Sequence, residues 1–503
     1  MSFFKKNKGM PSFVNKGINP LFPSLEDNIK YICEAFNNTD DLKMRKVTFH
    51  EKQGKLFYLE AMTDPKIIEH SFLIPLTEAD ECDDLRNVIT NVGFNTSTNL
   101  NDAVSALLMG SCALVLEGEK ETYLFNTPQM NTRAPDEPEN EKVVRGSHLG
   151  FVESLDINMN LIRQRVKNRQ LMIKYYELGM ESNRKMAIVY MNQLANPSLV
   201  EEIEKRILSI SMDSIIAPGY IEECIEEHPM SPFPQNLYTE RPDRLEAHLM
   251  EGRVAIMTEG STDAIIMPVT FFSFFQSPDD FNNRFYEGSV FRLLRLFSFW
   301  GTLTFPPLYI AVVGFHFEII PYDMVVIVKG SIENVPFPPF VEALVMVITI
   351  ELIREAGLRL PTPIGQTIGI VGGLIIGEAV VNAGLVSNVM VIVIALTAIM
   401  SFTIPAYEMG NTIRILLFPT MIAAATLGFV GIVVSLMFII IHMCKLQSFG
   451  TPYITPLAPL NIKGLKDALV RFPIWSMNKH SKDVHAQLPL KQRSSREWDK
   501  NDR

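Results

Sequence analysis

Long apolar stretches occupy most of the chain between Leu293 and Cys444. A helix needs roughly 20 mainly apolar residues to cross the ~30 Å hydrocarbon core of a bilayer. The sequence therefore predicts a polytopic α-helical transmembrane bundle over residues 286–445. The expected segments are about 293–317, 338–353, 363–385, 388–409 and 415–444, the last of them long enough to tilt or to break at Pro419.

The locations of the two chain ends limit how many of these segments cross. No apolar run follows the lysines of the first 17 residues, so we expect no signal peptide and a soluble half that stays inside the cell. From Lys445 onward, eleven Lys and Arg stand against five Asp and Glu, an excess that is typical of a cytoplasmic tail. Two ends on the same side require an even number of crossings.

One of the five segments should then not cross. The segment 338–353 is shorter than the others and carries Glu342 and Glu351, so we expect it to be re-entrant or interfacial. This arrangement leaves Arg354 and Arg359 outside, against the usual charge bias. Six crossings, with the last stretch split, remain an alternative.

The half of the chain before the apolar stretches has a mixed α/β pattern with two subdomains. A helix over 99–109 precedes a hairpin between Cys112 and Phe125, and a second hairpin lies within 253–268. The expected organisation is a flexible N-terminus at 1–24, subdomain I at 25–127, a linker at 128–142, subdomain II at 143–285 and, after the membrane region, a basic cytoplasmic tail at 446–503.

The two hairpins share a residue pattern. Gly110, Ala113, Glu117 and Gly118 recur at the same spacing as Gly252, Ala255, Glu259 and Gly260. Two explanations of this repeated pattern remain: a duplicated subdomain, or the general similarity of any two hairpins.

Three further elements are expected in the second subdomain. The residues 153–178 predict a long helix, 185–194 a strand and 198–208 a helix with acidic residues in its first turn. The basic residues of the first helix are interpreted as a solvated face, namely Arg163, Arg165, Lys167 and Arg169.

No pattern in the chain indicates catalysis. A phosphate-binding glycine loop, a nucleophile elbow and an HExxH motif are all absent from the sequence. The five cysteines have no pairing or ligand spacing, and the tail has no basic stripe with interleaved aromatic residues. We therefore expect no enzyme, no catalytic residue, no metal, no cofactor and no nucleic-acid partner.

The segment 363–385 is the most informative membrane segment. Small residues at intervals of four let helix backbones approach closely, and here they are Gly365, Gly369, Gly373 and Gly377. A helical wheel places a second set of residues within about a third of the circumference, mostly away from those glycines. These candidate pore-lining residues are Thr367, Val371, Leu374, Glu378, Val381 and Asn382.

An ionised carboxylate inside a bilayer costs several kcal/mol unless water, a cation or a partner faces it. Glu378 is therefore interpreted as part of an acidic ring in an oligomeric cation pathway. The alternatives are a protonated carboxyl and a static pair with an arginine. The other carboxylates of the membrane region are Glu342, Glu351 and Glu408, the last expected at the interface near the end of its helix.

Several strings of this sequence resemble the A subunit of GerA-type spore germinant receptors. They occur in order and cover nearly everything from about residue 25 to 475. Examples are VVRGSHLGFVESLDINMNLIRQR at 143–165, SPFPQNLYTERPD at 231–243, FFQSPDDF at 274–281, ENVPFPPFVEAL at 333–344, ELIREAGLRLPTPIGQTIGIVGG at 351–373, SFTIPAYEMG at 401–410 and SFGTPYITP at 448–456.

This resemblance implies a multi-pass protein of the spore inner membrane, with its N-terminal region and tail facing the spore core. It implies three kinds of partner: a transporter-like B subunit that binds the nutrient, a lipoprotein C subunit, and identical copies that form a channel for monovalent cations. Glu378 stands where relatives commonly have Gln, and Val347 where they commonly have Glu, so residue roles in the pathway do not transfer directly.

A channel-forming subunit of a nutrient receptor that starts spore germination is expected first. A scaffold homologue that clusters receptors, like the sporulation-protein paralogue of the same family, is the alternative. A secondary transporter is disfavoured, because no pair of broken helices stands out.

Overall fold

The structure is a computed structural model. It describes residues 19–50, 52–78, 85–89, 93–129, 137–333, 335–360, 373, 377–462, 464–480, 484 and 486–491. The chain forms two compact units. The first unit comprises Met1–Pro138, His148–Ile221 and Thr239–Ile266, and the second unit comprises Glu139–Ser147, Glu222–Tyr238 and Met267–Arg503.

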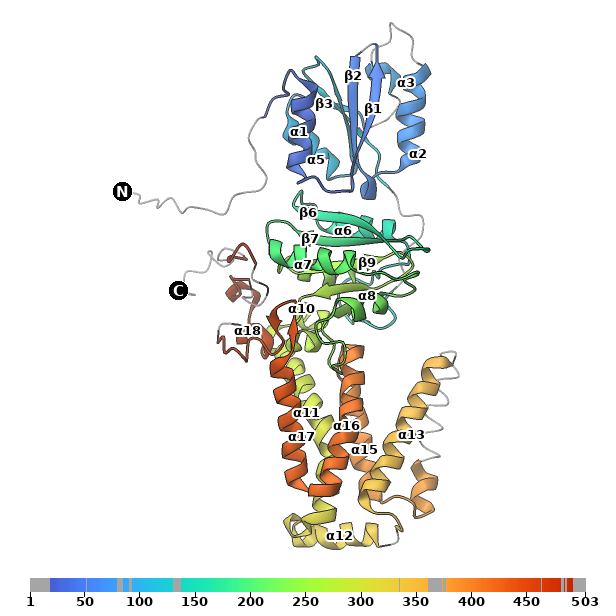
Figure 1. Cartoon of the computed structure of the whole chain (residues 1–503), viewed down its shortest axis with the longest axis vertical. Coiled ribbons are helices and arrows are strands. Elements are labelled where there is room, and N and C mark those ends of the chain that lie inside the picture. Colours follow the sequence, from blue (N-terminus) through green and yellow to red (C-terminus); the bar gives the residue numbers. More distant parts are fainter. Residues whose placement is uncertain are drawn as a thin grey trace, which may run out of the picture. The chain divides into compact units, whose positions relative to one another are not determined.

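The first sheet has five strands in the order β1-β2-β4-β5-β3, and all neighbouring strands are antiparallel (Figure 1). Its strands are β1 (Leu42–Phe49), β2 (Lys52–Leu59), β3 (Asn95–Ser97), β4 (Ser111–Leu116) and β5 (Thr122–Asn126). The helices around it are α1 (Leu25–Ala35), α2 (Pro65–Ile68), α3 (Ile74–Glu78), α4 (Leu85–Val88) and α5 (Leu100–Leu107), with short turns at Glu60–Met62 and Glu69–Leu73.

Strand β4 is buried on both faces, because its side chains alternate between two cores. Ala113 and Val115 join the core formed with α1 and α5. Cys112 and Leu114 join the core on the other face, which includes Phe72. This explains why the predicted strand is a continuous apolar run rather than an alternating one.

The second sheet repeats the plan of the first, with the order β6-β7-β9-β10-β8. Its strands are β6 (Leu171–Leu178), β7 (Arg184–Met191), β8 (Leu237–Thr239), β9 (Val254–Thr258) and β10 (Ala264–Met267). Its helices are α6 (Leu155–Arg165), α7 (Pro197–Leu208), α8 (Pro218–Ile225) and α9 (Pro242–Leu249).

The similarity between the two hairpins includes their backbone conformation. Gly110 and Gly252 end the helices that precede β4 and β9, with φ of +81° and +93°. Gly118 and Gly260 turn the hairpins, with φ of +75° and +78°. Only glycine adopts such angles without strain, and the shared strand order favours duplication over an accidental likeness of two hairpins.

The long helix predicted over 153–178 is wrong. Helix α6 ends at Arg165 and strand β6 begins at Leu171. The basic side chains are not a uniformly solvated face either, since Arg163 is 1% exposed. A buried guanidinium is tolerated here because the carboxylate of Asp41 compensates it. The strand and the helix predicted at 185–194 and 198–208 correspond to β7 and α7.

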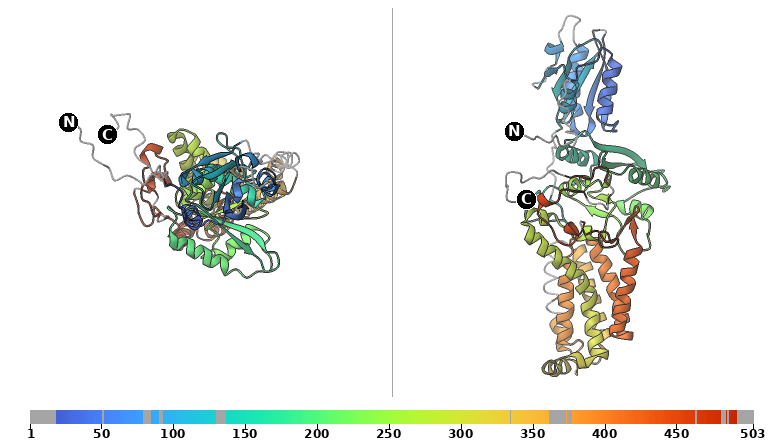
Figure 2. Two further views of the ribbon diagram at one scale, coloured as in Figure 1. Left: turned by 90° about the horizontal axis from the view of Figure 1, so that it is seen from above. Right: turned by 90° about the vertical axis from the view of Figure 1, so that its left-hand side faces the viewer.

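The second unit contains the apolar helices (Figures 1 and 2). They are α11 (Phe285–Phe315), α12 (Tyr322–Ile332), α13 (Pro339–Arg359), α15 (Asn388–Phe402), α16 (Tyr407–Leu427) and α17 (Phe429–Lys445). By length and composition, α11 and α16 are long and apolar enough to cross a membrane, whereas α15 and α17 are shorter apolar helices. Helix α11 packs against α15 and α16, and α16 packs against α17.

Several predicted segment ends differ from the structure. Helix α11 starts at Phe285 rather than at 293, and α13 continues to Arg359 rather than ending at 353. Helix α12 was not predicted; none of its side chains is buried, and it runs crosswise to α11 (Figure 1). Most of the predicted segment 363–385 lies outside the described residues. Within the described part of this segment, residues 377–382 are helical.

Two breaks between helices lie at other positions than the sequence predicts. The predicted segment 388–409 stops at Phe402, because Pro405 disfavours helical backbone at the residue before it. The predicted segment 415–444 breaks at Gly428, whose φ is +61°, and Pro419 lies inside α16. The predicted last stretch is therefore divided between the two helices α16 and α17.

Smaller elements complete the second unit. They are the helical turn Phe271–Phe275, α10 (Pro278–Asn282), the turn Phe317–Ile319, the hairpin β11 (Gln447–Ser448) and β12 (Thr451–Pro452), α18 (Leu465–Ala468) and the turn Ile474–Ser476. The chain after α17 thus contains ordered elements, and the ring of Tyr453 is fully buried within the unit.

Candidate functional site

Glu378 lies in the helical stretch 377–382 with an exposed side chain. No hydrogen bond or ion pair joins it to any residue in the described part of the chain. Asn382, one turn further on, is also exposed, and Val381 between them is half-buried. The other candidate pore-lining residues, Thr367, Val371 and Leu374, lie outside the described residues.

The predicted packing glycines are only partly described. Gly365 and Gly369 lie outside the described residues. A Cβ atom added at Gly373 or Gly377 would meet no described atom within 4 Å. These two glycines therefore pack against no other described helix of the same chain.

Glu342 is buried among three helices. Its Oε2 atom accepts a hydrogen bond from the backbone N–H of Ser387 at 2.9 Å. The hydroxyl of Ser387 caps α15 by accepting from the N–H of Met390, and it also bonds the hydroxyl of Tyr309 on α11 at 3.1 Å. A carboxylate at a helix N-terminus is favoured by the helix dipole, so Glu342 serves to join α13 to α15.

Glu351 is compensated by two arginines. Its Oε1 atom lies 3.2 Å from Nη1 of Arg354, and its Oε2 atom lies 3.6 Å from Nε of Arg414 on α16. Arg354 also donates to the hydroxyl of Ser401 on α15 at 3.1 Å. Arg354 thus faces the helix bundle.

A small cavity of about 20 Å³ adjoins this group, and its other lining side chains include Thr302 and Thr397. With two guanidinium groups and one carboxylate, the pocket has a net positive charge. Like charges repel, so this pocket is a poor site for a permeating cation.

Glu408 lies in the first turn of α16, where the structure places a helix start rather than the predicted helix end. The side chain is half-buried. Of the four candidate membrane carboxylates, Glu378 is the one with an exposed side chain in the described part of the chain, whereas Glu342 and Glu351 are held by contacts within it.

The helices present apolar side chains outward. Large side chains on α15, α16 and α17 are more than half exposed, for instance Ile392, Ile399, Ile415, Val433 and Phe438. A soluble monomer rarely leaves such an extended apolar surface in water. These faces are suited to lipid or to contact with other subunits.

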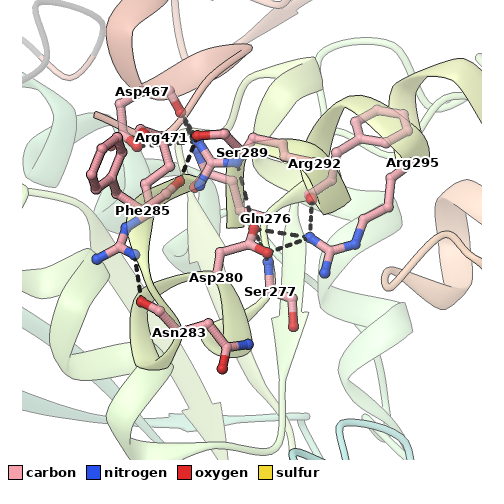
Figure 3. Close-up of polar contacts among 11 residues, drawn as sticks. Gln276, Ser277, Asp280, Asn283, Phe285, Ser289, Arg292, Arg295, Asp467 and Arg471 are labelled. Atoms are coloured by element: carbon pink, nitrogen blue, oxygen red, sulfur yellow. Dashed lines mark hydrogen bonds and ion pairs between the residues drawn. The ribbon is translucent and has the colours of Figure 1, made fainter. Parts of the chain in front are cut away.

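A cluster of charged residues, which no sequence pattern indicated, fixes the start of α11 (Figure 3). The carboxylate of Asp280 on α10 is 1% exposed and lies 2.8 Å from Nη1 of Arg295. Arg292 is fully buried; its Nε lies 3.5 Å from Asp280 and its Nη1 lies 3.1 Å from Asp467 on α18.

Arg471 completes this cluster from the C-terminal segment. Its guanidinium donates to the carbonyl of Asn283 at 2.9 Å, and its own carbonyl accepts from the hydroxyl of Ser289 at 2.9 Å (Figure 3). Burial, followed by the charge of Arg292, lowers the pKa of Arg471. The cluster therefore holds residues 467–471 against α10 and the first turns of α11.

The family profile of the Bacillus/Clostridium GerA spore germination protein matches residues 30–483. The chain belongs to the GerA family. The match covers most of both units, so the resemblance noted in the sequence is confirmed at the level of the family.

Several relatives of this GerA protein come from Bacillus subtilis strain 168. Spore germination protein B1 is 38% identical over 463 residues, covering 90% of this chain and 96% of the relative. Spore germination protein A1 is 38% identical over 458 residues, covering 90% and 95%. The uncharacterized membrane protein YfkQ is 36% identical over 467 residues, covering 92% and 91%.

One solved structure is also similar to this GerA chain. It is the N-terminal domain of the A subunit of the Bacillus megaterium spore germinant receptor GerK3, which is 26% identical. The match covers 51% of this chain and 99% of that domain, with a TM-score of 0.41.

Proposed function

We propose that this GerA-family chain is the A-type subunit of a nutrient germinant receptor in the spore inner membrane. Identical copies would surround a pathway for monovalent cations, and a B-type and a C-type subunit would complete the receptor. The role is to bind partners and to gate ion flow, rather than to catalyse a reaction.

The observation that carries the proposal is the environment of Glu378. Its carboxylate is exposed in the single chain, with no cation beside it in the described part. An ionised carboxylate at membrane depth needs water, a cation or a partner. In an oligomer whose copies surround a central axis, Glu378 would face the water of the pathway. The helix surface at Gly373 and Gly377 would pack against a neighbouring copy.

The other membrane carboxylates support this choice by exclusion. Glu342 accepts a hydrogen bond at the start of α15, and Glu351 is held between two arginines. Neither can turn toward a permeating ion without breaking contacts inside the chain. A ring built from Glu378 requires no such rearrangement.

The charged cluster at the start of α11 supports an even number of crossings. Asp467 contacts Arg292 directly, so the C-terminal segment and the start of α11 lie on the same side of any membrane that the helices between them cross. We infer a multi-pass protein whose N-terminal region and tail both face the spore core, as the basic composition of the tail also favours.

Nutrient binding by the B-type partner would open the pathway. A ligand shifts such an equilibrium only through its different affinities for the closed and open states. The A-type oligomer must therefore contact its partner differently in the two states, and the exposed apolar faces of α15, α16 and α17 offer surfaces for this contact.

The test is ion conductance of the complete receptor reconstituted in liposomes. Glu378→Ala and Glu378→Gln should reduce nutrient-dependent cation flux and lower the preference for cations over anions, because the ring loses its charge. The matched control is Glu355→Gln on α13, an exposed carboxylate that already has a partner, since its Oε1 lies 2.6 Å from Nη2 of Arg359.

The outcomes separate the two candidate roles. Normal flux and selectivity in both Glu378 variants, at normal protein level and assembly, would contradict the pathway. If the assembled copies conduct no ions in any nutrient yet still recruit B-type and C-type subunits, the scaffold role applies instead.

A further inference from the structure

The segment between α8 and β8 contacts the ends of two membrane helices. We call residues 226–236 the junction loop; they belong to the second unit together with the helices. The carbonyl of Pro232 accepts from the hydroxyl of Thr412 on α16, and the hydroxyl of Ser231 lies 2.8 Å from Nε2 of His442 on α17. Movement of the junction loop would therefore act on both helix ends.

Two carboxyl groups stand at the base of the junction loop. Glu222 and Glu226 are four positions apart, so they lie on the same side of one helical turn, and their carboxyl groups are close enough to affect each other's pKa. The hydroxyl of Tyr238 donates to Oε2 of Glu222 at 2.6 Å. Oε1 of Glu226 accepts from the backbone N–H of Gln235 at 3.2 Å and from the side-chain amide of Asn236 at 3.3 Å.

Gln235 links this pair to the chain that follows α17. Its side-chain amide donates to the carbonyl of His228 at 2.8 Å, and its own carbonyl accepts from the hydroxyl of Ser448 at 2.8 Å. The neighbouring ring of Phe233 packs against Tyr453 with 6.2 Å between ring centres. The position of Glu226 thus affects the contacts that the junction loop makes with α16, with α17 and with the chain that follows α17.

No Lys, Arg or His forms an ion pair with Glu222 or Glu226 in the part of the chain that the structure describes. Two adjacent carboxylates without a cation cannot both ionise readily, because their charges repel. Burial, and then the charge of Glu222, raise the pKa of Glu226 to about 7. The other titratable groups nearby are Glu223 on α8, Glu227 and His228 in the junction loop, Tyr238, Tyr453, and His442 with Lys445 at the end of α17.

We propose that Glu222 and Glu226 form a proton-binding site that makes the fit of the junction loop on α16 and α17 depend on pH. With one proton, the two carboxyl groups can share it in a hydrogen bond, and the loop stays in contact with the helix ends. Loss of that proton places two negative charges side by side and loosens the loop. The effect on ion flux rests on the proposed function, whereas the proton site itself does not.

The first experiment measures the proton site directly. Hydrogen–deuterium exchange of the full-length protein in lipid nanodiscs is compared at about pH 6 and about pH 8, on either side of the raised pKa, after correction for intrinsic exchange. In the unaltered chain, residues 226–238 and the adjoining ends of α16 and α17 should exchange severalfold faster at the higher pH.

Two variants decide the outcome. Glu226→Gln keeps the size and hydrogen-bonding capacity of the side chain without its charge, so the pH difference should be lost. Glu223→Gln removes a charge from an exposed neighbour on the same helix and should retain it. Equal exchange at both pH values in the unaltered chain, or an unchanged pH difference in Glu226→Gln, would overturn the proposal.

The second experiment tests whether the site regulates ion flux. Nutrient-dependent cation flux of the reconstituted receptor is measured over the same pH range, with the pH set on the side of the soluble region. The flux should change with pH in the unaltered receptor and lose that dependence in Glu226→Gln. If exchange responds to pH but flux does not, the proton site stands and its coupling to the pathway is refuted. If no receptor conducts at all, the failure lies in the proposed function.

Discussion

The guanidinium group of Arg163 donates to both carboxylate oxygens of Asp41, at 2.9 Å each. Arg163 also donates to the carbonyl of Leu171 at 2.9 Å, and Asp41 accepts from the hydroxyl of Thr39 at 2.7 Å. Asp41 precedes β1 and Arg163 lies on α6, so this buried pair connects the two sheets of the first unit.

Removing one partner of this pair should destabilise the first unit strongly. Arg163→Ala or Asp41→Ala leaves a buried charge without compensation, which costs about 3–5 kcal/mol. Pulse proteolysis of the full-length protein across a urea series measures the loss of stability.

A surface ion pair provides the control for that experiment. Lys43 and Glu60 lie 3.2 Å apart with side chains 41% and 52% exposed. Lys43→Ala should change stability by less than ~1 kcal/mol. A similar small change in Arg163→Ala would contradict the role assigned to the buried pair.

Gly431 permits close contact between α16 and α17. A Cβ atom at this position would overlap the backbone carbonyl of Ala423. Gly431→Ala should therefore separate the two helices and lower the thermal stability of the purified protein, although alanine favours helix by about 1 kcal/mol over glycine.

Gly410, also on α16, is the matched control for Gly431. A Cβ atom added there meets no described atom within 4 Å. Gly410→Ala should leave the stability unchanged or raise it slightly. Equal melting temperatures for the two variants would contradict the close packing at Gly431.

The features that could be predicted from sequence are those set over short distances along the chain. The two hairpins and their turns at Gly118 and Gly260 depend on neighbouring residues, and the structure contains both turns with positive φ. Apolar stretches also predict the positions of most of the apolar helices of the second unit. Their ends were less certain, because one glycine, Gly428, breaks the last stretch where a proline was expected to.

The features that could not be predicted depend on pairing between distant residues. Asp41 and Arg163 are 122 positions apart, and Arg292 and Asp467 are 175 apart. A basic residue on a helix looks solvated until its partner is known. Glu378 and Glu351 show the same limit: both are acidic residues in apolar surroundings, and only the fold reveals that Arg414 of α16 lies beside Glu351.

Glu342 should stabilise the helices through its hydrogen bond to Ser387. Glu342→Leu leaves the buried N–H of Ser387 without an acceptor and should cost about 1–3 kcal/mol. Glu342→Gln keeps an acceptor oxygen at the same place and should behave nearly as the unaltered chain. The thermal stability of both variants in detergent is compared, and equal losses would contradict the capping role.

The side of the membrane on which the C-terminal segment lies can be tested at Cys444. Its side chain is exposed at the end of α17, whereas Cys112 is buried and burial raises the pKa of its thiol to about 12. In a chain with serine at the other three cysteine positions, only Cys444 should then react with a maleimide at neutral pH, because thiolates are the reactive species. The contact between Asp467 and Arg292 places the C-terminal segment beside the start of α11. A membrane-impermeant maleimide should therefore label Cys444 in inside-out vesicles and not in intact cells, and the reverse pattern would contradict the inferred topology.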